Sequence, residues 1–405
     1  MIMATRERTA DGGKPGALGP GVGGRAAVVP RELLRWVWRV VGVFVAVRAT
    51  VLVVALASAH AADRRTLSIL TSWDAQWYAS IAAHGYGLTR VDGGRILSDY
   101  AFFPLYPVLE AVGSSLSGVQ PVVAGLVVSG VAGLVAAAGI GAVARQQGLS
   151  DGAAVVSVAL WAAVPIGVVE SMAYSESLFV ALASWALWCA LRERWWCAGV
   201  LACGAALTRP QGVVVVAAVV VAAGSPIIGH AVRRDSTPPV GRRGARLAAA
   251  GLALVGGVGY VGWVGLRRGS VTGYLQVTRE WGNSFDGGVT FVRWLVRLLA
   301  GESRVGGLLC LGALALLAAL LTALIRRPPS LPVTVYVVGL VVLALTSTAY
   351  FGSKPRYLLP AFPLLFPVAS WLEKRGRGAT VVGLTVLTAG SAAFAAWWLL
   401  GPGPP

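Results

Sequence analysis

Long apolar stretches separated by short arginine-rich segments constrain this chain more than any other feature of its sequence. An α-helix needs about 20 mostly apolar residues to cross the hydrocarbon core of a bilayer. The first such stretch runs from Trp36 to Ser58. We expect ten further spans at 121–143, 153–169, 177–191, 196–208, 212–224, 247–266, 306–325, 331–349, 357–372 and 379–400. The sequence therefore predicts an all-α, polytopic membrane protein with about 11 transmembrane helices.

The composition supports a single membrane domain. Of the 405 residues, 56% are hydrophobic and 13% are charged, whereas soluble domains carry about 25% charged residues. No polar stretch is long enough to form a soluble domain, so we assign 36–400 to one transmembrane domain. Residues 1–35 are rich in Gly, Pro, Ala and Arg, and we expect them to be disordered.

The positive charge is distributed as membrane topology requires. The chain has 34 Lys and Arg against 17 Asp and Glu, and the basic residues sit in short clusters between apolar stretches. This pattern predicts a cytoplasmic N-terminus in a cell membrane and contacts with membrane lipid, and it gives no reason to expect a nucleic-acid partner. It places the two long polar segments, 60–118 and 267–305, on the external side.

Metal and cofactor chemistry is not indicated. The four cysteines lie in or beside apolar stretches without the paired spacing of a zinc site, and the three histidines are scattered. We therefore expect no metal and no cofactor.

The segment Thr71 to Tyr78 carries the first candidate site. If it is helical, Asp74 and Tyr78 share one face and Trp73 and Trp77 share the adjacent one. A carboxylate beside aromatic rings at a membrane surface suits a general base that acts on a sugar hydroxyl, with the rings stacking on the sugar. The same residues equally suit a capping box, in which Thr71 and Asp74 close a helix start, and an interfacial aromatic belt.

Three further acids are predicted to lie on the external side, Asp99 in the first long segment and Glu170 and Glu176 in a short junction between two spans. Asp99 precedes a Phe-Phe-Pro-Leu-Tyr-Pro sequence and is either a second acid near Asp74 or a solvated loop residue; the following segment, 102–118, is expected to be a surface helix. Glu170 and Glu176 flank a short turn that is rich in hydroxyls, which suggests sugar or acceptor contacts. Ser175 and Glu176 alternatively form an ordinary helix start.

Cations at two helix breaks are candidates for binding a phosphate. Arg209 precedes Pro210 between two short apolar stretches, and Lys354 and Arg356 begin an external helix against the charge trend. Guanidinium groups bind phosphate oxygens without a metal. The alternatives are that Arg209 reaches water and that Lys354 and Arg356 anchor to lipid headgroups. Arg48 lies inside the first span and needs a partner.

Five segments occur in a characteristic order: TSWDAQWYASIAAHGYG, YAFFPLYPVL, AYSESLF, LTRPQGV and SKPRYLLPAFPLLFP. Together they resemble the PIG-V-like mannosyltransferases, a family of GT-C-fold glycosyltransferases, from about Trp36 to Leu372. The resemblance implies a large first external loop that holds the catalytic acid, and transfer of mannose from polyprenyl-phosphate-mannose at the outer membrane face without a metal. It makes Asp74 the candidate general base, and Arg209, Lys354 and Arg356 the residues that hold the donor phosphate.

The acceptor and one alternative function stay open at this stage. The Ala-, Val-, Gly- and Arg-rich composition is typical of a high-GC bacterial gene, so we expect a lipid, glycan or glycoprotein acceptor of the cell envelope. The competing function is a transporter or flippase of a lipid-linked sugar. Transporters often contain internal repeats, whereas this sequence shows none and gathers its polar groups on one side.

Overall fold

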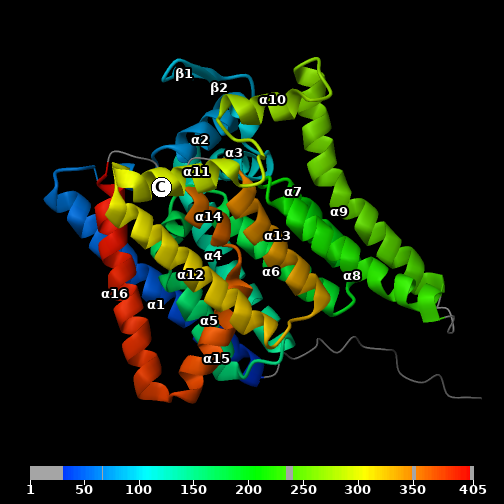
Figure 1. Ribbon diagram of the computed structural model, residues 1–405. Coiled ribbons are helices and arrows are strands. Elements are labelled where there is room, and N and C mark those ends of the chain that lie inside the picture. Colours follow the sequence, from blue (N-terminus) through cyan, green and yellow to red (C-terminus); the bar gives the residue numbers. More distant parts are fainter. Residues whose placement is uncertain (1–30, 66, 234–239, 349–352, 402–405) are drawn as a thin grey trace, which may run out of the picture.

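The computed structural model describes residues 31–65, 67–233, 240–348 and 353–401. Long helices run roughly side by side in a block, and short elements cover one end of it (Figure 1). Five helices are each long and apolar enough to cross a bilayer: α1 (Arg31–Ala61), α4 (Pro121–Gln146), α9 (Val240–Arg267), α12 (Arg304–Ile325) and α16 (Arg377–Leu399). A bent pair, α5 (Asp151–Ala163) with the 3₁₀-helix η3 (Pro165–Ser171), brings the number to six if it forms one span.

Shorter apolar helices fill the block between these spans. They are α6 (Glu176–Leu191), α7 (Trp195–Ala206), α13 (Leu331–Thr346) and the apolar first part, Gly212–Ser225, of α8 (Gly212–Arg233). The protein is thus a mostly helical, multi-pass membrane protein, as the sequence predicts. The finer count of 11 spans stays a prediction.

The remaining elements are short, and those that follow α1 and α9 form the covering layer at the end of the block (Figure 1). The elements of this layer are η1 (Ser68–Leu70), α2 (Asp74–His84), β1 (Thr89–Asp92), β2 (Arg95–Ser98), η2 (Asp99–Ala101), α3 (Leu105–Ser117), α10 (Gly273–Glu280), α11 (Val289–Arg297) and the π-helix η4 (Leu298–Glu302). The other short elements are α14 (Lys354–Leu358), η6 (Phe362–Leu365) and α15 (Phe366–Lys374), and α15 lies at the opposite end of the block (Figure 1). The layer contains both segments that were predicted to be external, 60–118 and 267–305.

Small residues on α4 allow its neighbours to pack closely. A Cβ atom on Gly141 would lie 3.0 Å from the Trp36 ring of α1, and one on Gly139 would lie 3.0 Å from the Trp185 ring of α6. Membrane helices lack a hydrophobic drive to associate within lipid, so close backbone approach at small residues supplies much of the packing energy. Helices α1, α4 and α6 are therefore closely packed against one another.

A β-hairpin is one departure from the predicted all-α fold. Strands β1 and β2 pair antiparallel, with Arg90 opposite Leu97. Their turn is Gly93-Gly94, whose φ angles of 54° and 78° suit a two-residue hairpin loop that most side chains would strain.

Two predicted spans are not single helices. The span at 153–169 bends by 85° between α5 and η3, where Pro165 lacks the amide hydrogen that would continue the helix. The span at 357–372 is divided among α14, η6 and α15, because Pro360, Pro363 and Pro367 interrupt it.

The N-terminal boundary also differs from the prediction. Helix α1 begins at Arg31 rather than at Trp36, so residues 31–35 are helical instead of disordered. Residues 1–30 lie outside the described part of the chain.

Candidate active site

Asp74 is the first residue of α2 and follows a strained backbone position. Trp73 has φ 56° and ψ −116°, values that a type II′ turn usually assigns to glycine, and such strain gathers at functional sites. The predicted capping box is absent, because the Thr71 hydroxyl donates to the Leu67 carbonyl instead, at 3.0 Å. The Asp74 side chain is 27% exposed, so it remains accessible to a ligand.

A buried ion-pair cluster surrounds Asp74. Its Oδ2 accepts a hydrogen bond from Nη2 of Arg356 at 2.8 Å. The same guanidinium donates to Oε1 of Glu176, from Nε at 2.8 Å and from Nη2 at 2.5 Å. Arg209 reaches that same oxygen through Nη1 at 2.6 Å. One carboxylate, Glu176, therefore fixes two arginines, and one of these fixes Asp74.

Hydroxyl groups extend the cluster. The Ser175 hydroxyl lies 2.7 Å from the Tyr78 hydroxyl and accepts from Nη1 of Arg209 at 3.2 Å. Ser175 occupies the N-cap position of α6 and Glu176 lies in the first turn, as the helix-start interpretation predicts, but the Ser175 side chain makes no cap hydrogen bond. Burial raises the pKa of Tyr78 above its usual range, so its phenol stays neutral and serves as a hydrogen-bonding group.

These side chains face a common cavity. A cavity of about 360 Å³ is lined by Asp74, Tyr78, Arg209 and Arg356, and by Trp281 from the segment after α10. Its volume is that of a small-molecule site. The structure thus brings together residues from four of the five segments that were singled out in the sequence, with Glu176 directly behind the cavity wall.

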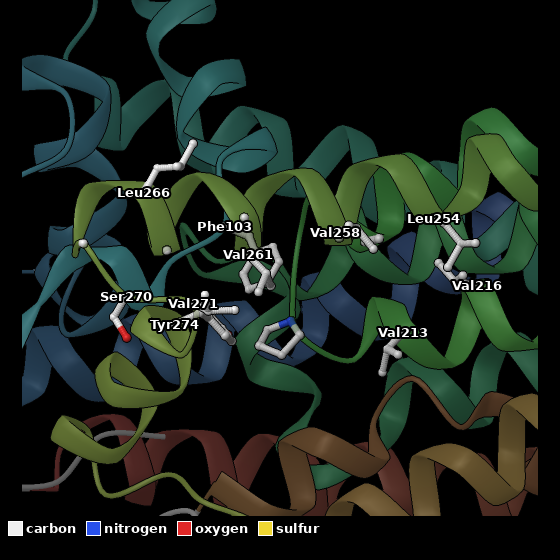
Figure 2. A pocket seen from close by; sticks show the side chains of 16 residues that line it. Phe103, Val213, Val216, Leu254, Val258, Val261, Leu266, Ser270, Val271 and Tyr274 are labelled. Atoms are coloured by element: carbon white, nitrogen blue, oxygen red, sulfur yellow. The ribbon is translucent and has the colours of Figure 1, made fainter.

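An apolar groove adjoins this polar cavity. The groove has a volume of about 740 Å³, and Phe103 and Pro210 line both it and the cavity. Figure 2 shows its length: Val216 and Leu254 lie at one end and Ser270 at the other, on helices α8 and α9 and on the turn after α9. An amphiphilic ligand could therefore place its polar end beside Arg209 and its apolar end in the groove.

The two tryptophans of the first motif are packing residues. Trp77 is buried and stacks on Phe102 at 5.6 Å, and the Arg90 guanidinium lies 4.7 Å from the Trp77 ring. Trp73 packs against the main apolar core. Neither tryptophan is among the residues that line the cavity, whereas Tyr78 is.

Asp99 and Glu170 also lie outside the cavity lining. Oδ2 of Asp99 accepts the backbone amides of Gly87 and Leu88, both at 2.8 Å, and so closes the loop after α2. Burial raises the pKa of Asp99, and those amide hydrogen bonds oppose the rise. Glu170 is buried in η3, and nearby Arg48 donates to the Ser171 hydroxyl at 2.7 Å and to the Ala162 carbonyl at 3.2 Å. Arg48 thus finds its hydrogen-bond partners on α5 and η3.

Lys354 and Arg356 separate despite their proximity in sequence. The Lys354 ammonium donates to the carbonyls of Ala344, at 2.9 Å, and Ser347, at 2.6 Å, at the end of α13. It is not among the cavity-lining residues, whereas Arg356 is. Burial lowers the pKa of Lys354. This contact attaches α14 to α13 and thereby helps to hold Arg356 in place.

Several lining residues were not singled out from the sequence as site residues. Gln211 accepts from Nε of Arg209 at 3.3 Å. Arg95 and Leu97 come from the hairpin, and Tyr357 follows Arg356. Gln211 and Tyr357 stand inside two of the five segments, which was the available signal, whereas nothing in the sequence marks Arg95.

Comparison with solved structures defines the fold class. The crystal structure of ArnT from Cupriavidus metallidurans bound to undecaprenyl phosphate matches with a TM-score of 0.51 and 19% identity, over 85% of this chain and 63% of that one. Its apo state matches equally, at 20% identity. The AglB oligosaccharyltransferase from Archaeoglobus fulgidus, in complex with an inhibitory peptide and a dolichol-phosphate, matches with a TM-score of 0.46 and 12% identity, over 88% of this chain and 56% of that one.

The chain therefore has a GT-C-like fold, as the sequence resemblance implies. It spans 63% of the length of ArnT. No protein-family profile and no curated protein matches the sequence.

Proposed function

We propose that this protein is a membrane glycosyltransferase that moves a sugar, mannose by its sequence resemblance, from a polyprenyl-phosphate donor to an acceptor at the outer face of the cell membrane. One observation carries the proposal. An accessible carboxylate, Asp74, shares a cavity with the guanidinium groups of Arg209 and Arg356, and that cavity adjoins an apolar groove. A lipid-phosphate-sugar has matching parts in the same order.

The donor fits the two spaces in one direction. A polyprenyl chain occupies the groove between α8 and α9, and the phosphate that follows it directly lies at Arg209, beside the shared residue Pro210. The sugar then extends towards Asp74 and Tyr78. Undecaprenyl phosphate, the ligand named for the ArnT structure, has this architecture of a long apolar chain and a phosphate.

The proposed reaction is a direct displacement at the anomeric carbon. The acceptor hydroxyl forms the new carbon–oxygen bond while its proton passes to Asp74. The bond from the anomeric carbon to the phosphate oxygen breaks, and the electron pair leaves with the polyprenyl phosphate. That phosphate gains one negative charge, which Arg209 and Arg356 stabilise as it develops. A single displacement inverts the anomeric centre.

The other candidate residues support these groups. Glu176 holds the two arginines in position, and Ser175 and Tyr78 hydrogen-bond at the edge of the sugar site. We assign Lys354 to holding α14 rather than to direct phosphate contact, because its donors already bind carbonyls of α13 and the residue after it. Trp73, Trp77, Asp99 and Glu170 support the shape of the site.

One assay distinguishes a glycosyltransferase from a transporter of the lipid-linked sugar. Purified protein in liposomes is given polyprenyl-phosphate-mannose with a labelled sugar and a membrane extract that contains acceptors. We expect label on a lipid or protein product that needs the enzyme. Intact labelled donor that crosses the bilayer without forming a product would instead identify a flippase and overturn the proposal.

A further inference from the structure

Helix α11 lies at the end of the helix block, set at an angle to α12 near the start of that span (Figure 1). It contacts α12 and α13, yet none of residues 289–297 is buried. The helical path continues through η4, breaks at Gly301, whose φ is 145° and ψ is −14°, and resumes as α12 at Arg304. A short exposed helix that leads directly into a membrane span lies close to the level at which that span leaves the lipid.

The side chains of α11 form three lengthwise stripes, because residues three, four and seven positions apart share one side of a helix. The stripe that packs on the protein is half buried and consists of Phe291, Trp294 and Leu295. The next stripe is apolar but 46%, 58% and 58% exposed, and consists of Val289, Val292 and Val296. The third stripe is polar and exposed, and consists of Thr290, Arg293 and Arg297. An exposed valine stripe thus runs beside an exposed arginine stripe.

The valine stripe continues a surface that already meets lipid. Helix α12 is one of the membrane-spanning helices. Its first turns carry Val305, Leu308 and Leu309, which are 70%, 63% and 71% exposed. Interfacial amphipathic helices bury their apolar face about 5–10 Å into the boundary between headgroups and acyl chains, and keep their basic face outside it. The bilayer is therefore the occupant that fits the valine stripe.

The charges of α11 suit the headgroup layer. The helix carries Arg293 and Arg297 and no acid. Asp286 stands before the helix, where its two carboxylate oxygens accept the amides of Gly288, at 2.9 Å, and Thr290, at 2.8 Å, and so hold the helix start. Arginine side chains beside an apolar stripe can reach the phosphates that phospholipids carry at this depth.

The residues before α11 connect it to the polar cavity. Asn283 lines that cavity. The amide of the next residue, Ser284, donates to the Thr348 hydroxyl at 2.7 Å, and the Thr348 amide donates to the Ser284 carbonyl at 2.8 Å. The Lys354 ammonium, at the start of α14, lies 5.2 Å from the centre of the Phe291 ring. Helix α11 is thus joined to one wall of the cavity and to α14.

We propose that α11 is an interfacial helix that binds a phospholipid surface on the cavity side of the membrane. Its valine stripe lies among the first carbons of the acyl chains, and its arginine stripe lies at the lipid phosphates. Because α11 is joined to the cavity wall, it holds the polar cavity at the depth of the headgroups. This placement goes beyond the proposed glycosyl transfer and does not depend on it.

Dyes attached to single cysteines measure the depth of each stripe. The full-length chain, with its four native cysteines replaced by alanine, carries Val292→Cys, Val296→Cys or Arg297→Cys in phosphatidylcholine liposomes. The matched control is Val91→Cys, because Val91 is a 76% exposed valine of the hairpin, which stands away from the long helices (Figure 1). One quencher is a nitroxide on the upper acyl chain, and the other is iodide on both sides of the membrane. Where the cysteine-free chain does not fold, a fluorescent amino acid at the same positions of the wild-type chain gives the same readout.

The acyl-chain nitroxide should quench the dyes at positions 292 and 296 several-fold more strongly than the dye at position 91, and iodide should show the reverse order. The dye at position 297 should lie between them for both quenchers. Iodide quenching at 292 and 296 as strong as at 91 would place the valine stripe in water and overturn the proposal. Protection of both positions from both quenchers would show that protein covers the stripe, either a second copy or another segment of the chain, and would also overturn it.

Discussion

Replacement of Glu176 by glutamine should destabilise the fold far more than replacement of a comparable exposed acid. Oε1 of Glu176 accepts hydrogen bonds from both Arg209 and Arg356, and the Glu176, Arg209 and Arg356 side chains are 1%, 12% and 7% exposed. Because both guanidinium groups bond to one oxygen, their nitrogens lie within about 5 Å of each other, a separation at which two charges repel by about 3 kcal/mol at an effective dielectric of about 20.

The expected cost follows from that geometry. Breaking a buried ion pair by removing one partner costs about 3–5 kcal/mol, and we expect Glu176→Gln to fall in this range because the amide keeps the shape but not the charge. The matched control is Glu280→Gln, whose pair with Arg268 spans 2.9 Å with side chains 29% and 28% exposed. Exposed pairs contribute about 0.2–1 kcal/mol.

Thermal unfolding followed by tryptophan fluorescence in the same detergent measures both variants. We expect a fall of several degrees for Glu176→Gln and little change for Glu280→Gln, with Asp74→Asn closer to the control because Asp74 is partly exposed. Equal unfolding temperatures for wild type, Glu176→Gln and Glu280→Gln would show that the buried cluster does not hold the site together.

Two further substitutions test other parts of the account. Gly212→Ala should sharply reduce the yield of folded protein, because its Cβ would lie 2.6 Å from the Ala205 carbonyl oxygen where α8 crosses α7, whereas Gly224→Ala, with no atom within 4 Å, should fold normally; equal yields on size-exclusion chromatography would contradict this packing. Burial raises the pKa of Glu110 from its ordinary 4.5 to about 9, so the folded chain keeps a proton that the unfolded chain releases, and stability should fall as the pH rises between these values. For Glu110→Gln, the free energy of unfolding should fall less between pH 6 and pH 8.5 than it does for wild type. An equal fall in both proteins would show that Glu110 is not the group that keeps the proton.

Most of the site was predictable in its parts but not in its arrangement. The Asp74, Glu176, Arg209 and Arg356 segments each stand out in the sequence, yet Asp74 and Arg356 are 282 positions apart. Nothing local indicates that Glu176 bridges the two arginines. Such pairings depend on how α2, α6 and α14 meet in three dimensions.

Local geometry explains the predictions that differ from the structure. Lys354 and Arg356 were expected to act together, but residues two apart on a helix point in different directions, and only Arg356 of the two lines the cavity. Trp73 was expected to share a helical face with Trp77, but Trp73 precedes the first helical residue and has a positive φ. The hairpin could have been anticipated from Gly93-Gly94 between short strand-forming segments.

The most direct test of the central claim compares Asp74→Asn with wild type and with Asp63→Asn, an exposed acid of the preceding loop. The measurement is single-turnover transfer of labelled mannose from polyprenyl-phosphate-mannose, with donor binding measured on the same samples. If Asp74 is the general base, Asp74→Asn should bind the donor and lose about 10²–10⁴-fold in transfer rate, while Asp63→Asn should keep the wild-type rate. Full turnover by Asp74→Asn would contradict the account.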